Sequence, residues 1–318
     1  MYKDFYHLAR DPFEITPDPY FFFPTQPHNE ALAILYHGIR SQKGFVLVTG
    51  EVGTGKTLLL RCLLDVLNRD QVAFSYIFNP LLSPLEFLQY VMGDFGLSNQ
   101  GKSKGEMLLE LNKFLVNRHA QGLSTALIVD EGQLLSLDLL EEIRLLTNLE
   151  TAKKKLVQIV LAGQTELDRK INFPEMRQLR QRIALRCRLR PFTESETQAY
   201  VQLRLELAGA NSKSSTIFSQ AAMRTLFRYS RGIPRLINTL CENALVTAYA
   251  RQADTVTPEI VAGVADDFLM EDEHPSIACP PFGHSRAAQA ELAHVIDPLD
   301  STHAVAERHV PVMGDVKL

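Results

Sequence analysis

The stretch that decides the fold is Gly50-Glu51-Val52-Gly53-Thr54-Gly55-Lys56-Thr57, which has the spacing G-x-x-x-x-G-K-T. It follows an apolar run, residues 44–49, that predicts a buried strand. It precedes residues 58–64, which contain no glycine or proline and predict a helix. Glycines let a backbone wrap closely around phosphate oxygens, and the loop N–H groups and the start of the helix attract an anion. This order of strand, glycine loop and helix predicts a site for nucleotide phosphates.

Two residues at the end of this loop carry its chemistry. Lys56 is expected to reach the β- and γ-phosphates, and the Thr57 hydroxyl is expected to ligate Mg²⁺. The alternative is a chance match to a short pattern, which the flanking strand and helix disfavour. The other predicted nucleotide contacts are Gly50, Glu51, Val52, Gly53, Thr54, Gly55 and Leu58.

Composition limits the classes of protein that the chain can belong to. With 318 residues and a net charge of −4, it is long enough for one large or two small domains and is not a polycation. Its four cysteines are far apart and form no C-x-x-C, which disfavours disulfides and zinc and fits a reducing cytosol. The first residues show no signal-peptide pattern, and no apolar run is long enough to span a bilayer. We therefore expect a cytoplasmic protein that reaches a membrane only through partners.

The first two thirds of the chain alternate between strand and helix patterns, which predicts an α/β fold with a parallel sheet covered on both faces. Further strands are expected at 72–78, 124–129, 156–162 and 183–189, with helices at 28–42, 85–95, 106–119 and 134–149. After Pro191 only helices are expected, at 193–207, 219–229, 234–250 and 258–268. This change predicts a second, all-helical domain.

The two ends of the chain have different compositions. Residues 1–27 are rich in aromatic residues and proline, which predicts an irregular strap that packs its rings on the domain; the alternative is that part of it lines an adenine pocket. From residue 271 the chain is polar and proline-containing, and we expect a disordered tail with one short helix near 286–295. Five of the nine histidines lie there, but their irregular spacing favours a solvated tail over a metal site. The predicted divisions are 1–27, 28–191, 192–270 and 271–318.

Two adjacent acids end the strand expected at 124–129. Carboxyl ends of parallel strands form the ligand-binding edge of an open α/β sheet. Asp130 is therefore expected to hold Mg²⁺, and Glu131 to orient the attacking water, provided that the chain turns so that both side chains face the site. The alternative is an acid pair that only stabilises the start of a helix.

Two further positions are candidates for sensing or completing the site. Gln164 ends the next strand and is expected to sense the γ-phosphate or place the water, unless it only caps a loop. Arg235 lies in the first turn of a helix that Gly232 and Pro234 initiate. A cation there opposes the helix dipole, which suggests a partner anion such as phosphate; a salt bridge to an acid of the domain is the alternative.

A basic run precedes the helical region, and its six arginines are Arg177, Arg180, Arg182, Arg186, Arg188 and Arg190. The alternation of Arg182, Arg186, Arg188 and Arg190 with apolar residues would leave one face of a strand charged. One or two of them are expected to be arginine fingers that complete a neighbour's site, with Arg182 the first choice and Arg180 the second. The alternatives are a solvated basic face and a nucleic-acid footprint, although no aromatic residues are interleaved for base stacking.

Taken together, these motifs resemble those of the AAA+ ATPases. The segments that carry the resemblance are the glycine loop, Leu127-Ile128-Val129-Asp130-Glu131-Gly132-Gln133, Leu161-Ala162-Gly163-Gln164, Gln181-Arg182-Ile183 and Gly232-Ile233-Pro234-Arg235. The opening Met1-Tyr2-Lys3-Asp4-Phe5-Tyr6, Pro12-Phe13 and Thr16-Pro17-Asp18-Pro19 narrow it to the general secretion pathway protein A (ExeA-type) family and its relatives in pilus and exopolysaccharide clusters. The resemblance covers about residues 1–270.

The resemblance implies a five-stranded sheet in the order 5-1-4-3-2 and a helical lid, with ATP bound between them in an oligomer. It also implies that Gln164 is sensor 1, Arg235 is sensor 2 and Arg182 is the finger. Three features differ from the family pattern. A polar tail stands where secretion members typically continue into a membrane segment and a peptidoglycan-binding region, Leu58 replaces a second threonine, and Gly132 replaces a common alanine.

The sequence thus predicts a cytosolic Mg²⁺-ATPase whose lid opens and closes with nucleotide state and drives assembly or remodelling of an envelope secretion, pilus or exopolysaccharide complex. Two other hypotheses stay open. One is a DNA-associated helper ATPase of the transposition type. The other is a switch that binds ATP without significant turnover.

Overall fold

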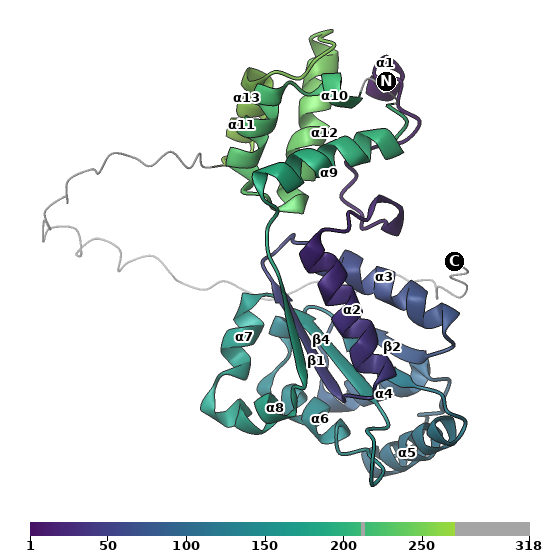
Figure 1. Ribbon diagram of the computed structural model, residues 1–318. Coiled ribbons are helices and arrows are strands. Elements are labelled where there is room, and N and C mark those ends of the chain that lie inside the picture. Colours follow the sequence, from purple (N-terminus) through teal and green to yellow (C-terminus); the bar gives the residue numbers. More distant parts are fainter. Residues whose placement is uncertain (211–213, 271–318) are drawn as a thin grey trace, which may run out of the picture. The chain divides into compact units, whose positions relative to one another are not determined.

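The computed structural model (Figure 1) describes residues 1–210 and 214–270, which fall in one compact unit. The expected tail, its short helix and its histidines lie outside the described residues. The centre of the unit is a parallel sheet of five strands: β1 (Phe45–Gly50), β2 (Ala73–Ile77), β3 (Thr125–Val129), β4 (Gln158–Gly163) and β5 (Leu185–Leu189). Each strand lies within two residues of its predicted limits.

The strands are arranged in the order β2-β3-β4-β1-β5, and every pair of neighbours is parallel. This is the order 5-1-4-3-2 that the resemblance implied, and it is confirmed. Thr49 of β1 pairs with Gly163 of β4, and Val129 of β3 pairs with Leu161 of β4. The carboxyl ends of β1, β3 and β4 therefore meet at one edge, which brings the glycine loop, the acid pair and Gln164 together.

Two hydrophobic clusters cover the two faces of the sheet, as the strand alternation requires. On one face, Val46 and Val48 of β1 pack with α2 (Gln26–Arg40) and α3 (Lys56–Arg69). On the other, Phe45 and Leu47 pack in a cluster supplied by α4 (Pro84–Asp94), α5 (Lys104–Ala120), α6 (Leu137–Leu146), α7 (Thr165–Ile171) and α8 (Arg177–Arg182). Figure 1 shows α2 lying across the sheet, where it contacts β1, β4 and β5.

Two of these helices, α7 and α8, were not predicted, and they change the interpretation of the basic run. Arg182 lies on α8 together with Arg177 and Arg180, and Arg190 follows β5, so the strand alternation applies only to Arg186 and Arg188. Six- and seven-residue helices are too short to show a helical period in sequence. The helix predicted at 134–149 is also shorter, because the Ser136 hydroxyl accepts from Leu139 N and caps α6 there.

After β5 all described elements are helices: α9 (Glu194–Leu207), α10 (Ser214–Ile217), α11 (Gln220–Ser230), α12 (Pro234–Ala250) and α13 (Pro258–Asp267). Thr193 and Glu196 form a capping box at the start of α9. Glu196 also accepts two hydrogen bonds from Arg190, and mainly for that reason its pKa is lowered to about 2. No helix in the described ranges is long and apolar enough to pass through a bilayer.

The N-terminal strap contains only short helices, α1 (Tyr2–Phe5) and the 3-10 turn η1 (Pro19–Phe21), as its prolines predict. Tyr6, Leu8 and Phe13 are buried in the cluster formed by α9 to α13. Further along, the carbonyl of Pro17 accepts a hydrogen bond from Arg61 of α3. The strap therefore contacts both the helical region and the sheet region.

A close backbone crossing joins β5 to the helices. Phe192, between β5 and α9, donates its N–H to Gly232 O at 2.8 Å. Gly232 has φ +72°, and a Cβ atom placed on it would lie 1.9 Å from Phe192 O. Only glycine can occupy this position without moving the linker.

We predict that Gly232→Ala lowers the free energy of unfolding by about 2–4 kcal/mol, because it adds left-handed strain to a backbone clash. The matched control is Gly263→Ala in α13, where an added Cβ meets nothing within 4 Å. That control should be neutral or stabilising by about 0.5–1 kcal/mol. Thermal melts of both variants check this, and a Gly232→Ala melt equal to that of Gly263→Ala would contradict it.

Candidate functional site

The glycine loop joins β1 to α3 in a conformation that depends on two glycines. Gly53 and Gly55 have φ of +79° and +95°, and Gly55 is the N-cap of α3. A Cβ on Gly53 would lie 2.8 Å from the Cβ of Arg235. The loop thus presents its backbone closely to the start of α3, which is the arrangement that an anion site requires.

Lys56 is buried within the loop that it follows. Its Nζ donates to Gly50 O at 2.9 Å and to Glu51 O at 2.8 Å. Burial lowers the pKa of Lys56, while the nearby carboxylates of Glu131 and Asp130 raise it. The ammonium therefore lies at the centre of the loop, held by carbonyls that a phosphate could replace as its partners.

Thr57 and Asp130 bring two hard oxygens together from different elements. The Thr57 hydroxyl donates to Asp130 Oδ2 at 2.7 Å, and Asp130 Oδ1 accepts from Glu131 N at 2.8 Å. Asp130 is 2% exposed, and burial raises its pKa despite these hydrogen bonds and the nearby Lys56 ammonium.

This pair fits Mg²⁺, because that ion takes one or two protein oxygens and fills its remaining positions with water and phosphate. No group of three or more His, Cys, Asp or Glu side chains suited to a metal occurs within residues 1–210 and 214–270. When bound, Mg²⁺ would neutralise charge on the phosphates. Thr57 and Asp130 would hold it.

Glu131 reaches the site through an unusual backbone conformation. Its φ and ψ are 51° and 35°, in the left-handed region that non-glycine residues rarely occupy. This turn reverses the strand alternation, so that Asp130 and Glu131 both reach the carboxyl edge, as the sequence analysis required. The Glu131 carboxylate accepts from the side-chain amides of Gln133 and Gln164, the second at 3.3 Å.

A cavity of about 410 Å³ lies over these residues. Its lining includes six predicted loop positions, Val52, Gly53, Gly55, Lys56, Thr57 and Leu58, together with Glu131, Gln164 and Arg235. Gly50, Glu51 and Thr54 are not part of the lining. They support the loop instead: Thr54 is fully buried, and its hydroxyl donates to Glu51 O at 2.8 Å.

The strap also lines the cavity, through residues 15–18. The composition of the strap predicts packing of its rings on the domain, with lining of an adenine pocket as the alternative; in the structure its rings are packed and other strap residues border the cavity. The aromatic rings of Tyr6, Phe13 and Phe21 are buried, whereas Ile15, Thr16, Pro17 and Asp18 border the cavity.

Arg235 approaches the loop from the start of α12. Its backbone N–H donates to Gly53 O at 3.3 Å, and its side chain is exposed at the cavity. Among the described residues it forms no ion pair, so the alternative of a salt bridge to an acid of the domain has no support. Its guanidinium is available for an anion in the cavity.

Several residues of the site could not be identified from the sequence. His28 of α2 is buried and donates from Nε2 to Thr54 O at 3.1 Å, because a carbonyl can only accept; its Nδ1 therefore accepts from Thr25 at 2.6 Å. Burial lowers the pKa of His28, which favours the neutral ring. Tyr76 of β2 donates to Asp130 Oδ2 at 3.4 Å. A lone histidine or tyrosine gave no pattern that could have identified either residue.

A polar cluster from the helical region also lines the cavity. Arg204 of α9 is 5% exposed, and its guanidinium lies 4.5 Å from the centre of the Phe21 ring. It donates to Tyr200 OH at 2.6 Å, and Tyr200 donates to Asn238 Oδ1 at 2.8 Å. These residues lie on the helix faces that also supply the core, so their spacing resembled ordinary packing.

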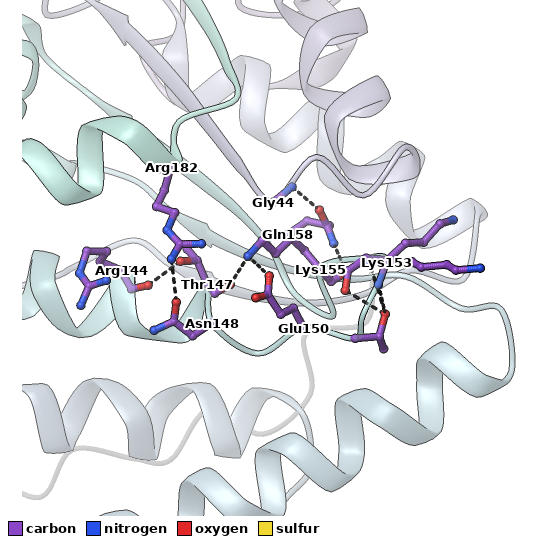
Figure 2. A network of polar contacts seen from close by, with 11 residues as sticks. Gly44, Arg144, Thr147, Asn148, Glu150, Lys153, Lys155, Gln158 and Arg182 are labelled. Carbon is purple, nitrogen blue, oxygen red and sulfur yellow. Dashed lines mark hydrogen bonds and ion pairs between the residues drawn. The ribbon is translucent and has the colours of Figure 1, made fainter.

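The predicted fingers, Arg180 and Arg182, do not line this cavity; both are exposed on α8. Figure 2 shows Arg182 pointing toward Asn148, to whose Oδ1 it donates at 3.2 Å. The same network fixes the turn between α6 and β4, through Lys155 Nζ to Thr147 O at 2.9 Å and Gln158 Nε2 to Lys155 O at 2.9 Å. Arg182 also borders a separate surface hollow with Arg144 and Arg177.

Comparison with known proteins agrees with this geometry. Residues 39–171 match a family described as AAA domain. The chain is 43% identical over 252 residues to General secretion pathway protein A of Aeromonas hydrophila, an alignment that covers 79% of this chain and 45% of the relative. The chain therefore spans less than half the length of that relative.

Solved structures with the same fold include three at low identity. They are Drosophila ORC bound to DNA (20% identity, TM-score 0.63, 83% of this chain and 65% of that chain), Cdc6p from Pyrobaculum aerophilum (18%, 0.59, 82% and 71%) and the RuvB Holliday junction branch migration motor of Thermotoga maritima (16%, 0.54, 79% and 72%). At these identities the likeness concerns the fold alone.

We predict that Asp130→Asn raises Tm in metal-free buffer at pH 7. An acid whose pKa is raised in the folded state destabilises the fold above that pKa, and the destabilisation is relieved as pH falls. Asparagine can still accept from Thr57.

The same change should abolish the increase in Tm that Mg²⁺ causes. In the unsubstituted chain, Mg²⁺ at a concentration of 100 Kd would raise the free energy of unfolding by about 2.7 kcal/mol. Differential scanning calorimetry measures both effects. The control is Asp138→Asn, an exposed position in the first turn of α6, and a lower metal-free Tm for Asp130→Asn would contradict the prediction.

Proposed function

We propose that this chain, which belongs to the AAA+ ATPases of the general secretion pathway protein A family, binds Mg²⁺ and ATP and hydrolyses the ATP to ADP and phosphate. The observation that carries the proposal is the 2.7 Å hydrogen bond between Thr57 and Asp130 beside Lys56, at the base of a cavity of about 410 Å³. The glycine loop, the proposed metal ligands Thr57 and Asp130, and the proposed general base Glu131 all meet there.

Each residue has a defined task in this proposal. Lys56 binds the β- and γ-phosphates, and Thr57 and Asp130 hold the metal. Glu131 accepts a proton from the attacking water, while Gln164 orients that water or the γ-phosphate. Arg235 contacts phosphate from α12 and so makes the helical region sensitive to the nucleotide.

The divisions of the chain follow from these tasks. We assign residues 28–191 to nucleotide binding and residues 192–270 to a lid, with residues 1–27 as a strap that closes the adenine side of the cavity. In the strap, residues 15–18 line the cavity together with Tyr200 and Arg204. These residues are the candidates for the adenine pocket.

The biological role follows from the relative named as a general secretion pathway protein. We propose that hydrolysis drives assembly or remodelling of an envelope secretion, pilus or exopolysaccharide complex, from the cytoplasmic side and through partner proteins. The exposed position of Arg182 outside the chain's own cavity supports a homo-oligomer, in which this arginine completes the site of a neighbouring copy.

We predict that Glu131→Gln lowers kcat for ATP by about 10²-fold or more, because it removes the general base, and leaves nucleotide affinity nearly unchanged. Lys56→Ala should instead weaken ATP binding, because it removes the cation at the centre of the loop. Phosphate release and calorimetric titration separate the two effects, with the exposed Glu175→Gln as a control. Binding without phosphate release in the unsubstituted chain would favour the switch hypothesis.

We further predict that Arg182→Ala lowers kcat by about 10³-fold and that mixing it with Glu131→Gln restores part of the activity. In mixed oligomers, the intact Arg182 of the Glu131→Gln copy can complete the cavity of the Arg182→Ala copy. Arg186→Ala, which changes an exposed arginine paired with Asp168 at 3.8 Å, is the control. No recovery on mixing would contradict a role in trans, and loss of salt-dependent duplex DNA binding in Arg182→Ala would favour the nucleic-acid interpretation.

A further inference from the structure

Gln133 connects two residues of the site and was assigned no role by the sequence motifs. Its side-chain Nε2 donates to Glu131 Oε2, and its Oε1 accepts from the backbone N–H of Gln164 at 3.0 Å. The amide orientation follows from these partners, because a carboxylate can only accept and a backbone N–H can only donate. Both polar ends of one side chain are therefore used.

The backbone of Gln133 is fixed as firmly as its side chain. Lys170 of α7 donates to Gln133 O at 2.6 Å and to Leu135 O at 2.7 Å, which holds the short 3-10 turn η2 (Gly132–Leu134) against α7. Gly163 leaves the necessary room, since a Cβ there would lie 3.0 Å from Gln133 Oε1. The groups around residue 133 therefore fit a glutamine side chain in this single orientation.

Glu131 depends on this support, because its own backbone is strained. A glutamate in the left-handed region is strained, and the surrounding contacts must offset that strain. Its second amide contact, from Gln164 Nε2 at 3.3 Å, is longer and comes from the residue proposed to contact phosphate or water. If Gln164 turns to phosphate, Gln133 is the amide that remains on the Glu131 carboxylate.

We propose that Gln133 is a positioning residue for hydrolysis. It holds the Glu131 carboxylate in place for the attacking water. It also links the position of that carboxylate to the backbone of Gln164, the residue that follows β4. This inference rests on the proposed ATPase function and adds to it a residue that touches neither metal nor phosphate and acts through Glu131.

Two substitutions separate the contacts of Gln133. In Gln133→Glu the side chain keeps its size and can still accept from Gln164 N–H, but it places a carboxylate against Glu131 and loses the donor. In Gln133→Met both hydrogen bonds are lost. We expect kcat to fall about tenfold or more in both variants at pH 8, because a displaced general base is costly, with KM within about twofold of the unsubstituted chain.

The pH profile supplies a readout that a merely structural role would not move. As pH falls from 8 to 6, the carboxylate introduced in Gln133→Glu should take up a proton, since a carboxylate placed against a second one has a raised pKa. That proton restores a donor between the two side chains. The kcat of Gln133→Glu relative to the unsubstituted chain should therefore rise as pH falls, whereas the same ratio for Gln133→Met stays flat.

The control is Gln220→Glu, which adds the same charge at an exposed first-turn position of α11. Phosphate release under saturating ATP and circular dichroism are measured for all variants, together with Glu131→Gln. If Glu131→Gln abolishes turnover while both Gln133 variants keep full kcat, or if the pH ratios do not differ, the inference is wrong and the proposed function stands. If the unsubstituted chain releases no phosphate, or Glu131→Gln turns over normally, the proposed function fails and the inference fails with it.

Discussion

The hydrogen bond between the Thr57 hydroxyl and the Asp130 carboxylate joins parts of the chain that are 73 residues apart. It can form only because β1 and β3 end at the same edge of the sheet, with β4 between them. The sheet order therefore decides the chemistry: the strand in the middle must end in Gln164, between the glycine loop and the acid pair. Burial raises the pKa of Asp130, and a carboxylate with a raised pKa gains most from a nearby cation. Burial of the Asp130 carboxylate destabilises the folded state, and a bound metal ion would reduce that destabilisation.

Features that repeat along the chain could be predicted from the sequence. The β1 and β3 strands are continuous apolar runs because both faces of the sheet are covered, and the glycine loop has a fixed spacing because phosphate geometry is fixed. The sheet order came from the resemblance and not from periodicity. The helices α7 and α8 were missed, because six or seven residues cannot display a period of 3.6. As a result Arg182 was assigned to the charged strand face, although it lies on α8.

The site residues that sequence could not supply are those whose role depends on tertiary contact. Gln133 follows the acid pair by two residues, yet only the left-handed turn at Glu131 and the approach of Gln164 give its amide two partners. His28 supports the loop through a single carbonyl, and Arg204 reaches the cavity from the helical region. Each is a lone polar residue among core positions, so the pattern that places it is the pattern of ordinary packing.

The helical region contacts the glycine loop closely at the first turn of α12. Arg235 N–H donates to Gly53 O, and Gly53 has no room for a side chain against Arg235. Three residues before Arg235, Gly232 crosses the linker at Phe192 even more closely. A movement of the loop around phosphate must therefore shift the first turn of α12, and the crossing at Phe192 passes that shift to the linker between β5 and α9. A close-packed contact transmits small displacements because it cannot absorb them. The two glycines thus provide a short route for the proposed coupling between nucleotide and lid.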